Sequence, residues 1–432
     1  MNPASVVRLL AVPLALAFVV PGCLSPIFGE KAPRFSDPLS AYGFEVPTDL
    51  STAVPASAID WPTFKRGDER AVLRILDHGA FNAFEEAASR FENLTGARVE
   101  HTAAKDAGSC LNEAIEDAKE PQYDILYCLD NALLMRAVDN EVLEPYTPRL
   151  APTVEEGLVF FDADDPWPAT PVDHGYIALN VDSTHGALED TPIAGLHDAR
   201  RNADLLVTED PNFSSPGLGF FLLTVERFGE TGPYTWKHYW SELFLGPDGK
   251  NLTGDEVLVT PDWSTAYEVH YSGGYGIYEE GHQGDRPIVV SYTESPAYEW
   301  YWDHVVPVAE GGGGDDHYGG DLADLPRVPL EPAGSAFHQI QTMGILRGTE
   351  DLAVAQAWIE FTLTRDFQEL AAPYNAVYPV GRGVGTEGVY GDVDPAPGSF
   401  PTLEPDWDTL TEERLKRLLD EWTRLCEEHE CR

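Results

Sequence analysis

The segment LRILDHGAFNAFEEAASRFENLTGARVE, residues 73–100, decides the fold class. Its first four residues form a short apolar run that is typical of a buried strand. Asn82 and Glu85 then have the spacing of a capping box, which predicts the start of a helix. Apolar residues recur on one face of that helix, and Gly96 is a typical helix end. A second strand is expected to begin at Val99, so the segment predicts a strand–helix–strand unit.

The same alternation continues along the chain. Ser109 is expected to cap the next helix, residues 124–129 have the composition of a buried strand, and Asp130 with Asn131 opens another helix. Further strands are expected at residues 172–181, 205–208, 257–260, 288–292 and 340–346, and further helices at 216–228, 351–362, 365–371 and, after a second capping box at Thr409 and Glu412, up to Leu425. This order predicts an α/β fold whose mainly parallel sheet has helices on both faces.

The length of the alternating region predicts two lobes. The chain has 432 residues, and the region from about residue 70 onward is longer than the roughly 150 residues of an average domain. We expect a bilobal domain over residues 70–432. Its first lobe would span about 70–168 plus a segment that returns later, and its second about 169–300 plus the C-terminal helices. Ligands of open α/β sheets bind at the carboxyl ends of the strands, so two facing lobes predict a cleft between them.

Residues 1–23 have the pattern of an export signal. Arg8 precedes an apolar run over residues 9–20 that is too short to span a membrane comfortably. Small residues before Cys23 resemble a lipobox, in which Cys23 becomes the lipidated first residue; an uncleaved signal anchor is the alternative. Residues 24–69, rich in Pro, Ser and Ala, are expected to be a tether. The rest of the chain would then lie outside the cytoplasm, either on the outer face of the cell membrane or in the periplasm, with the lipid as its only membrane contact.

Four further cysteines suit an oxidising compartment. Cys110, Cys128, Cys426 and Cys431 allow two disulfides, for which we expect local pairing of the first two and of the last two. A zinc site built from all four thiolates is the rival interpretation, although their spacing differs from that of zinc knuckles.

The charge of the chain excludes one class of partner. With 73 acidic and 28 basic residues, the formal net charge is −45, and such a field repels the phosphates of nucleic acids. An aromatic content of 11% argues against a disordered acidic chain. The charge fits an acidic surface that stays hydrated in strong salt, and it also fits a protein that binds cations.

The motifs of common enzymes are absent from the sequence. It contains no G-x-S-x-G, no P-loop and no H-E-x-x-H. Residues 383–388 match G-x-G-x-x-G, but no amphipathic helix follows them, so a glycine-rich loop is expected there. We therefore expect no catalytic residue, no cofactor and no resident metal.

Three segments put polar or aromatic residues where strands end and helices begin. Ser214 and Ser215 precede a proline that suits the first helical position, so this helix start offers N–H groups to an anion; simple capping by the serines is the alternative. Trp263 follows an expected strand and could stack on a planar cation rather than fill a core. Tyr292 ends the next expected strand and Tyr298 lies beyond it, and both are expected to wall a cleft, unless they are ordinary half-buried tyrosines.

Two Asp-His pairs, Asp77-His78 and Asp173-His174, also lie in or beside expected strands. Imidazole and carboxylate groups bind metals, and they hold aromatic heterocycles equally well. Because no further ligand spacing accompanies the pairs, we favour the second role.

Taken in order, these segments resemble the thiamine-binding proteins of thiamine ABC importers, within the type 2 extracellular solute-binding superfamily. The resemblance runs from about residue 73 to the C-terminal helix, and its most specific strings lie at residues 210–219 and 291–298. It implies a two-lobe type 2 periplasmic-binding-protein fold and a monomer that captures thiamine or a thiamine phosphate by lobe closure. It also implies a membrane permease and an ATPase as partners, and no enzymatic activity.

By position, the resemblance implies that Ser214 contacts phosphate or hydroxyl oxygens and that Trp263, Tyr292 and Tyr298 pack around the ligand's rings. The thiazolium of thiamine is a cation, and an aromatic face attracts cations by about 0.5–2 kcal/mol. A carboxylate such as Asp77, Asp130 or Asp173 would offset the same charge.

The sequence departs from this family at two positions. His78 stands where the family has a tyrosine, and another family aromatic falls near Ala376. Either Tyr374 supplies the missing ring or the ligand is a related compound.

Two alternatives to thiamine stay open. One is a binder of another cation, such as ferric ion or a polyamine, although ferric binders use adjacent tyrosines and no Tyr-Tyr pair occurs here. The other is an extracytoplasmic metal-dependent hydrolase that uses the two Asp-His pairs.

Overall fold

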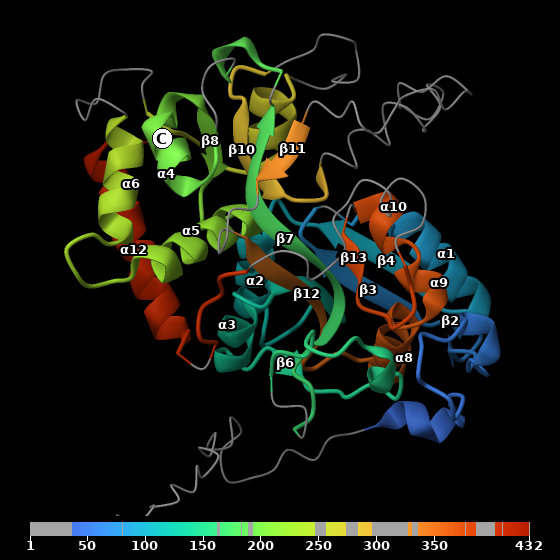
Figure 1. Ribbon diagram of the computed structural model, residues 1–432. Helices are drawn as coiled ribbons and strands as arrows, with labels where there is room; N and C mark the ends of the chain where they lie inside the picture. Colours follow the sequence, from blue (N-terminus) through green and yellow to red (C-terminus); the bar gives the residue numbers. More distant parts are fainter. Residues whose placement is uncertain are drawn as a thin grey trace, which may run out of the picture. The chain divides into compact units, whose positions relative to one another are not determined.

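One mixed β-sheet runs through the described part of the chain (Figure 1). The computed structural model describes residues 37–79, 81–161, 165–182, 184–188, 193–246, 256–273, 284–295, 327–330, 336–375, 377–385, 402–407 and 409–431. The strands of the sheet are β3 (Val72–Asp77), β4 (Arg98–Ala103), β5 (Ile125–Asp130), β6 (Leu143–Glu144), β7 (Thr170–Asp182), β8 (Leu206–Glu209), β9 (Leu258–Thr260), β10 (Ile288–Tyr292), β11 (Arg327–Leu330), β12 (Phe337–Leu346) and β13 (Tyr378–Pro379). A separate small sheet pairs β1 (Lys65–Arg66) with β2 (Glu69–Arg70).

Helices connect and cover these strands. The α-helices are α1 (Phe84–Thr95), α2 (Ala107–Glu116), α3 (Leu134–Asp139), α4 (Leu196–Arg201), α5 (Ser215–Phe228), α6 (Trp236–Leu245), α8 (Leu352–Thr362), α9 (Arg365–Gln368), α10 (Ala371–Asn375) and α12 (Glu412–Glu428). Short 3-10 turns are η1 (Pro38–Tyr42), η2 (Ala56–Ala58), η3 (Ala151–Thr153), η4 (Gly186–Leu188) and η5 (Ala203–Leu205), and η6 (Thr265–Tyr271) is a π-helix.

The sheet consists of two parallel groups joined by antiparallel strands. The strand order is β4-β3-β5-β12-β7-β10-β8-β9, with β3 parallel to β4 and β5, and β8 parallel to β9 and β10. The joining strands β12 and β7 run antiparallel to each other, β12 antiparallel to β5, and β7 antiparallel to β10. The expected mainly parallel sheet is therefore mixed, because an apolar run predicts burial but not the direction of a strand. We call β4-β3-β5 the first half and β10-β8-β9 the second half.

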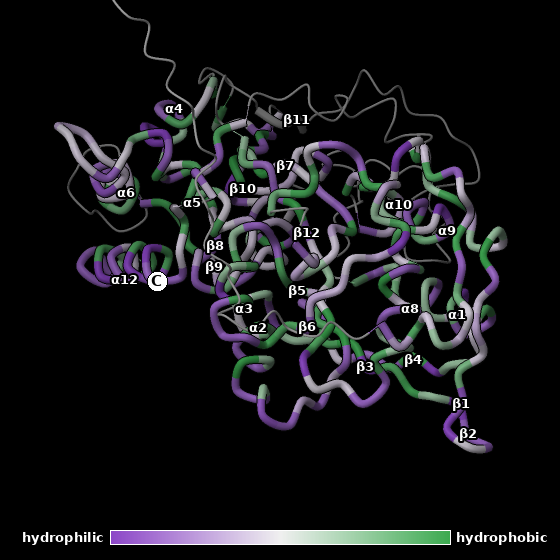
Figure 2. Tube along the Cα trace, turned by 90° about the horizontal axis from the view of Figure 1, so that it is seen from below, coloured by the Kyte–Doolittle hydropathy of each residue, from purple (hydrophilic) through white to green (hydrophobic). Residues whose placement is uncertain are grey.

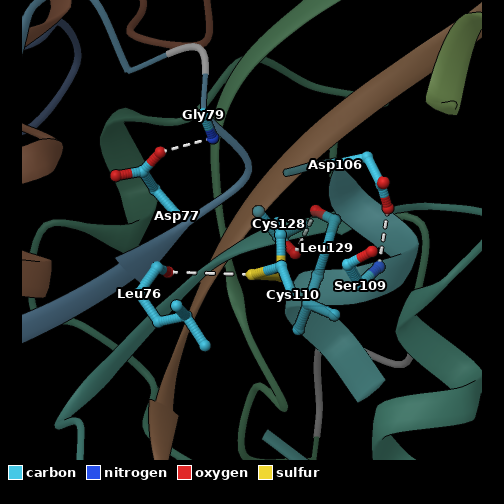
Figure 3. The surroundings of a disulfide bond; sticks show 9 residues. Leu76, Asp77, Gly79, Asp106, Ser109, Cys110, Cys128 and Leu129 are labelled. Carbon is cyan, nitrogen blue, oxygen red and sulfur yellow. Dashed lines mark hydrogen bonds between the residues drawn. A yellow bond between two sulfur atoms is a disulfide. The ribbon is translucent and has the colours of Figure 1, made fainter. Parts of the chain in front are cut away.

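The observed helix ends confirm some of the predicted capping and terminating residues and contradict others. Gly96 ends α1 with a φ of 69°, in the left-handed region that glycine adopts without strain. Asn82 does not cap α1, because the helix begins two residues later and the Asn82 amide donates to the carbonyl of Tyr374 instead. The cap of α2 is Asp106 rather than Ser109, whose N–H donates to Asp106 Oδ1 at 2.7 Å (Figure 3).

The C-terminal helix has the predicted apolar stripe. Leu415, Leu418, Trp422 and Cys426 are buried along α12, while hydrophilic residues recur along the same helix in Figure 2. Its cap is Thr411 rather than Thr409, because the Thr411 side chain accepts the N–H of Arg414. Trp422 packs edge to face on Trp240 of α6, with ring centroids 5.4 Å apart, so α12 docks on the second half.

Residues 37–69 pack on the first half and do not form the tether that we expected over residues 24–69. Leu39, Phe44 and Phe64 are buried in the same core as Phe91 and Trp358. The Leu39 N–H also donates to Gln356 Oε1, and the Ala56 N–H to Asp366 Oδ2. These apolar residues lack a regular period, so the sequence pattern gave no sign of their burial. Residues 1–36, with Cys23, lie outside the described residues.

Both local disulfides are confirmed. Cys110 of α2 bonds Cys128 of β5 (Figure 3), and Cys426 bonds Cys431 after α12. The four thiols are thus used in pairs, which excludes the zinc interpretation. Among the described residues, every helix is too short or too polar to cross a bilayer.

Candidate functional site

A cavity of about 390 Å³ opens where both halves of the sheet end. First-half residues of its wall follow β3 or lie on β5 and at the start of α2, and second-half residues come from the start of α5, from η6 and from β10. The joining strands β7 and β12 supply its floor. The wall consists of His78, Gly79, Asn82, Lys105, Asp106, Ala107, Tyr127, Asp173, Gly175, Phe213, Ser214, Ser215, Pro216, Asp262, Trp263, Ser264, Tyr267, Glu268, Tyr292, Ser295, Gln339, Gln341, Asn375 and Val377. The predicted position at the carboxyl ends of strands is therefore observed.

The cavity brings together six of the residues that the sequence singles out. They come from segments far apart in the chain and are His78, Asp173, Ser214, Ser215, Trp263 and Tyr292. Tyr298 and Ala376 lie outside the described residues. Tyr374 is 40% exposed and is not part of the wall, although its neighbour Asn375 is.

Two of the proposed carboxylates lie behind the wall. Asp77 is fully buried and accepts the N–H of Gly79 at 2.6 Å (Figure 3). Its Oδ2 also lies 3.3 Å from His101 Nε2. Asp130 accepts the N–H groups of Ala132 and Leu133 at 2.9 Å each, so it holds the turn after β5. Burial raises the pKa of both carboxyl groups.

The aromatic wall of the cavity is a stacked pair. The rings of Trp263 and Tyr267 lie 5.0 Å apart with an interplanar angle of 14°, and Trp263 Nε1 donates to Ser291 Oγ at 2.9 Å. Asp262 accepts the N–H and hydroxyl of Thr265, which fixes the start of η6 and with it both rings. The sequence analysis missed Tyr267, although its spacing of four residues from Trp263 is that of neighbours on a helix.

Carboxylates outnumber cations in the wall. Asp106, Asp173, Asp262 and Glu268 contribute to it, and Lys105 is the sole Lys or Arg among the described residues of the wall. Such a wall favours a positively charged guest over a negative one.

Asp173, which lies on β7, is the most deeply buried of these four acids. It is 6% exposed, and the hydroxyl of Tyr127 donates to its Oδ2 at 2.6 Å. Burial raises the pKa of Asp173 to about 7, and the hydrogen bond from Tyr127 lowers it in part. Burial also lowers the pKa of His78 to about 4, so His78 offers a neutral ring, tilted against Tyr127 with centroids 5.1 Å apart.

At the start of α5 a serine caps the helix, as in the alternative to an anion site that the sequence analysis gave. Ser214 is the N-cap and its Oγ accepts the N–H of Gly217 at 3.4 Å, while Pro216 has no N–H to offer. A Cβ on Gly217 would lie 2.6 Å from the Glu209 carbonyl oxygen, so the close approach of this helix to β8 requires glycine. Ser214 and Ser215 nevertheless line the cavity.

The two Asp-His pairs do not form a metal site in the described part of the chain, although His78 and Asp173 both line the cavity. His174 lies next to Asp173 on β7, where side chains alternate between faces, and its Nδ1 is 3.1 Å from His338 Nε2. Within the described residues, no three His, Cys, Asp or Glu side chains form a group that could hold a metal ion. This geometry removes the basis for a hydrolase built on the two pairs.

Comparisons with known proteins find distant relatives of one kind. No protein-family model matches the chain. The thiamine-binding periplasmic protein of Escherichia coli (strain K12) is 23% identical over 295 residues, which cover 67% of this chain and 74% of that protein. The protein of the same name from Brucella abortus is 24% identical over 324 residues, covering 74% and 78%.

Solved structures give the same result for the fold. A periplasmic thiamin binding protein superposes with a TM-score of 0.63 at 21% identity, covering 84% of this chain and 98% of the other. A ferric binding protein from Campylobacter jejuni gives 0.57 at 15% identity, covering 83% and 99%. The expected type 2 periplasmic-binding-protein fold is confirmed, and the chain is a distant homologue of thiamine-binding periplasmic proteins. The homologues with these names are periplasmic solute-binding proteins.

Proposed function

We propose that this protein captures thiamine, or a thiamine phosphate, outside the cytoplasm and delivers it to the permease and ATPase of an ABC importer. The observation that carries the proposal is the convergence of the stacked Trp263–Tyr267 pair and the carboxylates on one cavity. The distant homology to thiamine-binding periplasmic proteins supports the same ligand.

The chemistry of the cavity suits the two rings of thiamine. The thiazolium is a planar cation, which gains about 0.5–2 kcal/mol over an aromatic face and more when water is excluded. Asp173, Asp262 and Glu268 offset its charge. The aminopyrimidine is neutral and polar, which suits the amides of Gln339 and Gln341. A volume of about 390 Å³ lies in the range of small-molecule sites.

The origin of the wall residues supports capture of the ligand by closure of the two halves. Because Tyr127 belongs to the first half and Trp263 to the second, a bound ligand would contact both and favour the closed arrangement. The joining strands β7 and β12 are the connection between the halves in the described residues and would carry that movement.

A thermal-shift panel tests the ligand class. Purified protein is heated with thiamine, thiamine monophosphate, thiamine diphosphate, spermidine or Fe(III), since binding to the native state raises the melting temperature. We expect the thiamine compounds to stabilise the protein and the other two to leave it unchanged. Stabilisation by spermidine or Fe(III) alone would assign the site to another cation. The protein with Trp263→Ala is the matched control, in which the shift with thiamine should shrink.

We also propose that Cys23 is lipidated and holds the protein at the outer face of the cell membrane. The sequence pattern around Cys23 supports this anchor. In cells that express the full chain with Cys23→Ala, the protein should move from the membrane fraction to the soluble fraction, whereas Cys110→Ala should leave it in the membrane. Membrane retention of the Cys23 variant would favour an uncleaved signal anchor.

A further inference from the structure

The first turn of α2 touches the turn that precedes α5 at the edge of the cavity. Gly108 of α2 donates its N–H to the carbonyl oxygen of Phe213 at 3.5 Å. A Cβ on Gly108 would lie 2.7 Å from the carbonyl oxygen of Asn212, closer than the Cβ atoms of real proteins approach other heavy atoms. Because the obstacle is backbone, no rotation of a side chain removes it. The contact therefore requires glycine at this position.

The two sides of this contact are fixed to different halves of the sheet. A disulfide from Cys110 to Cys128 ties α2 to β5 of the first half (Figure 3). On the other side, the N–H of Asp210 donates to the carbonyl of Thr260 on β9 at 2.8 Å, which ties the turn to the second half. Asp210 Oδ1 accepts the N–H of Asn212 at 3.0 Å. A movement of one half relative to the other must therefore open or close the contact.

A second interaction joins the halves beside the first. Asp130 ends β5 of the first half, and Ser215 is the first residue of α5. Burial raises the pKa of the Asp130 carboxyl, and a hydrogen bond from the Ser215 hydroxyl lowers it in part. Ser215 lines the cavity. Since both interactions need the two halves side by side, the halves lie in a closed arrangement along this edge of the cavity.

We infer that Gly108 allows the two halves to close over the ligand and that a side chain at this position would hold them apart. This inference rests on the proposed function, in which closure captures the ligand. Gly108 is not part of the cavity wall, so a substitution there leaves the wall unchanged and acts on the ligand through closure. In an open arrangement the Asn212 carbonyl moves away, and alanine then suits a helix better than glycine does. A substitution should therefore separate ligand binding from stability.

Calorimetric titration of wild type, Gly108→Ala and Gly108→Leu with thiamine tests the inference. Affinity should fall about fivefold or more in Gly108→Ala, the lower end of what an added carbon in a packed contact costs, and further in Gly108→Leu. The melting temperature of Gly108→Ala without thiamine should not fall below that of the wild type. Gly186→Ala is the matched control, because a Cβ on Gly186 would meet open space, and it should match the wild type in both measurements.

Small-angle X-ray scattering measures the closure itself. The radius of gyration of the wild type should decrease when thiamine saturates the protein, whereas that of Gly108→Leu should stay at its ligand-free value. Wild-type protein that binds thiamine without contracting would overturn the inference. This comparison needs no variant, so it decides the matter even if Gly108→Leu fails to fold.

The outcomes separate this inference from the proposed function. Thiamine affinity that is equal in the wild type and both Gly108 variants would overturn the role of Gly108 and leave thiamine as the ligand. A melting temperature that falls in Gly108→Ala would also overturn it, because the contact would then belong to the ligand-free fold. Wild-type protein that binds no thiamine would overturn the proposed function, and the inference with it.

Discussion

The hydroxyl of Tyr127 donates a hydrogen bond of 2.6 Å to Asp173 Oδ2 across the floor of the cavity. Tyr127 comes from β5 of the first half and Asp173 from β7, which joins the halves. Because burial raises the pKa of Asp173 to about 7, the carboxyl group exchanges its proton near neutral pH. Binding of a cation in the cavity is therefore expected to be linked to loss of the proton from Asp173.

We predict that the affinity for thiamine rises with pH. A bound cation favours ionised Asp173, so binding releases a proton wherever the acid is protonated in the free protein. Affinity should increase between about pH 6 and pH 8 and level off above the pKa of about 7. His78 adds no slope there, because burial lowers its pKa to about 4 and the ring stays neutral. Calorimetry across this range, in buffers of different ionisation enthalpy, measures both the affinity and the proton.

Asp173→Asn is the variant that isolates this effect. The asparagine oxygen still accepts from Tyr127, but the side chain no longer titrates. Its affinity should be low at every pH and nearly independent of pH in this range. A slope that persists in Asp173→Asn would assign the proton to another group.

Trp263→Ala should weaken thiamine binding by about tenfold or more, the scale of one lost cation–π contact. Trp263→Phe keeps an aromatic face above the cavity but loses the hydrogen bond to Ser291, so its loss should be smaller. Tyr42→Ala removes an aromatic side chain that is 52% exposed and is not part of the wall, and it should bind as the wild type does. Equal affinities in all four proteins would remove Trp263 from the site.

Lys105 should govern the choice between thiamine and its phosphates. It is the sole Lys or Arg among the described residues of the wall, and it lies beside the start of α2. Lys105→Met should weaken binding of thiamine diphosphate by about fivefold and leave thiamine nearly unchanged, because a single partly exposed ion pair contributes about 1 kcal/mol. Lys119→Met, an exposed lysine elsewhere, is the control. If Lys105→Met weakens both ligands alike, the lysine holds the site in shape instead of pairing with phosphate.

Trp422→Ala should lower the free energy of unfolding by about 3–5 kcal/mol, as expected when a large buried side chain is removed from a core. Trp422 is fully buried and docks α12 on α6. Lys416→Ala, an exposed position on the same helix, should change stability by less than about 0.5 kcal/mol. Chemical denaturation of both proteins measures the difference, and similar values would mean that α12 does not depend on this contact.

The sequence predicted the order of the elements because periodicity and helix ends are local properties. Residues 288–292 match β10 in full, and Gly96 ends α1 as expected. The sequence did not predict that the sheet mixes parallel and antiparallel strands. This mixture arises because β12 pairs antiparallel with β7, which lies far from it in the sequence. The caps were misplaced by two or three residues wherever several Ser, Thr or Asp side chains compete for one helix start.

The candidate site was predictable only where a motif stood out. Trp263 follows a strand and Tyr292 ends one, both in recognisable strings, and both line the cavity. Tyr127 and Gln339 sit inside strands, and neither lies at a strand end or a helix start that would single it out. Their role depends on which strands become neighbours, and this information lies in the three-dimensional structure.

Calorimetric titration of the purified protein with thiamine tests the central claim most directly. The account predicts a single site per molecule, with binding that weakens in Trp263→Ala and is not displaced by spermidine. Heat of mixing no larger than that of buffer, or complete displacement of thiamine by spermidine, would contradict it.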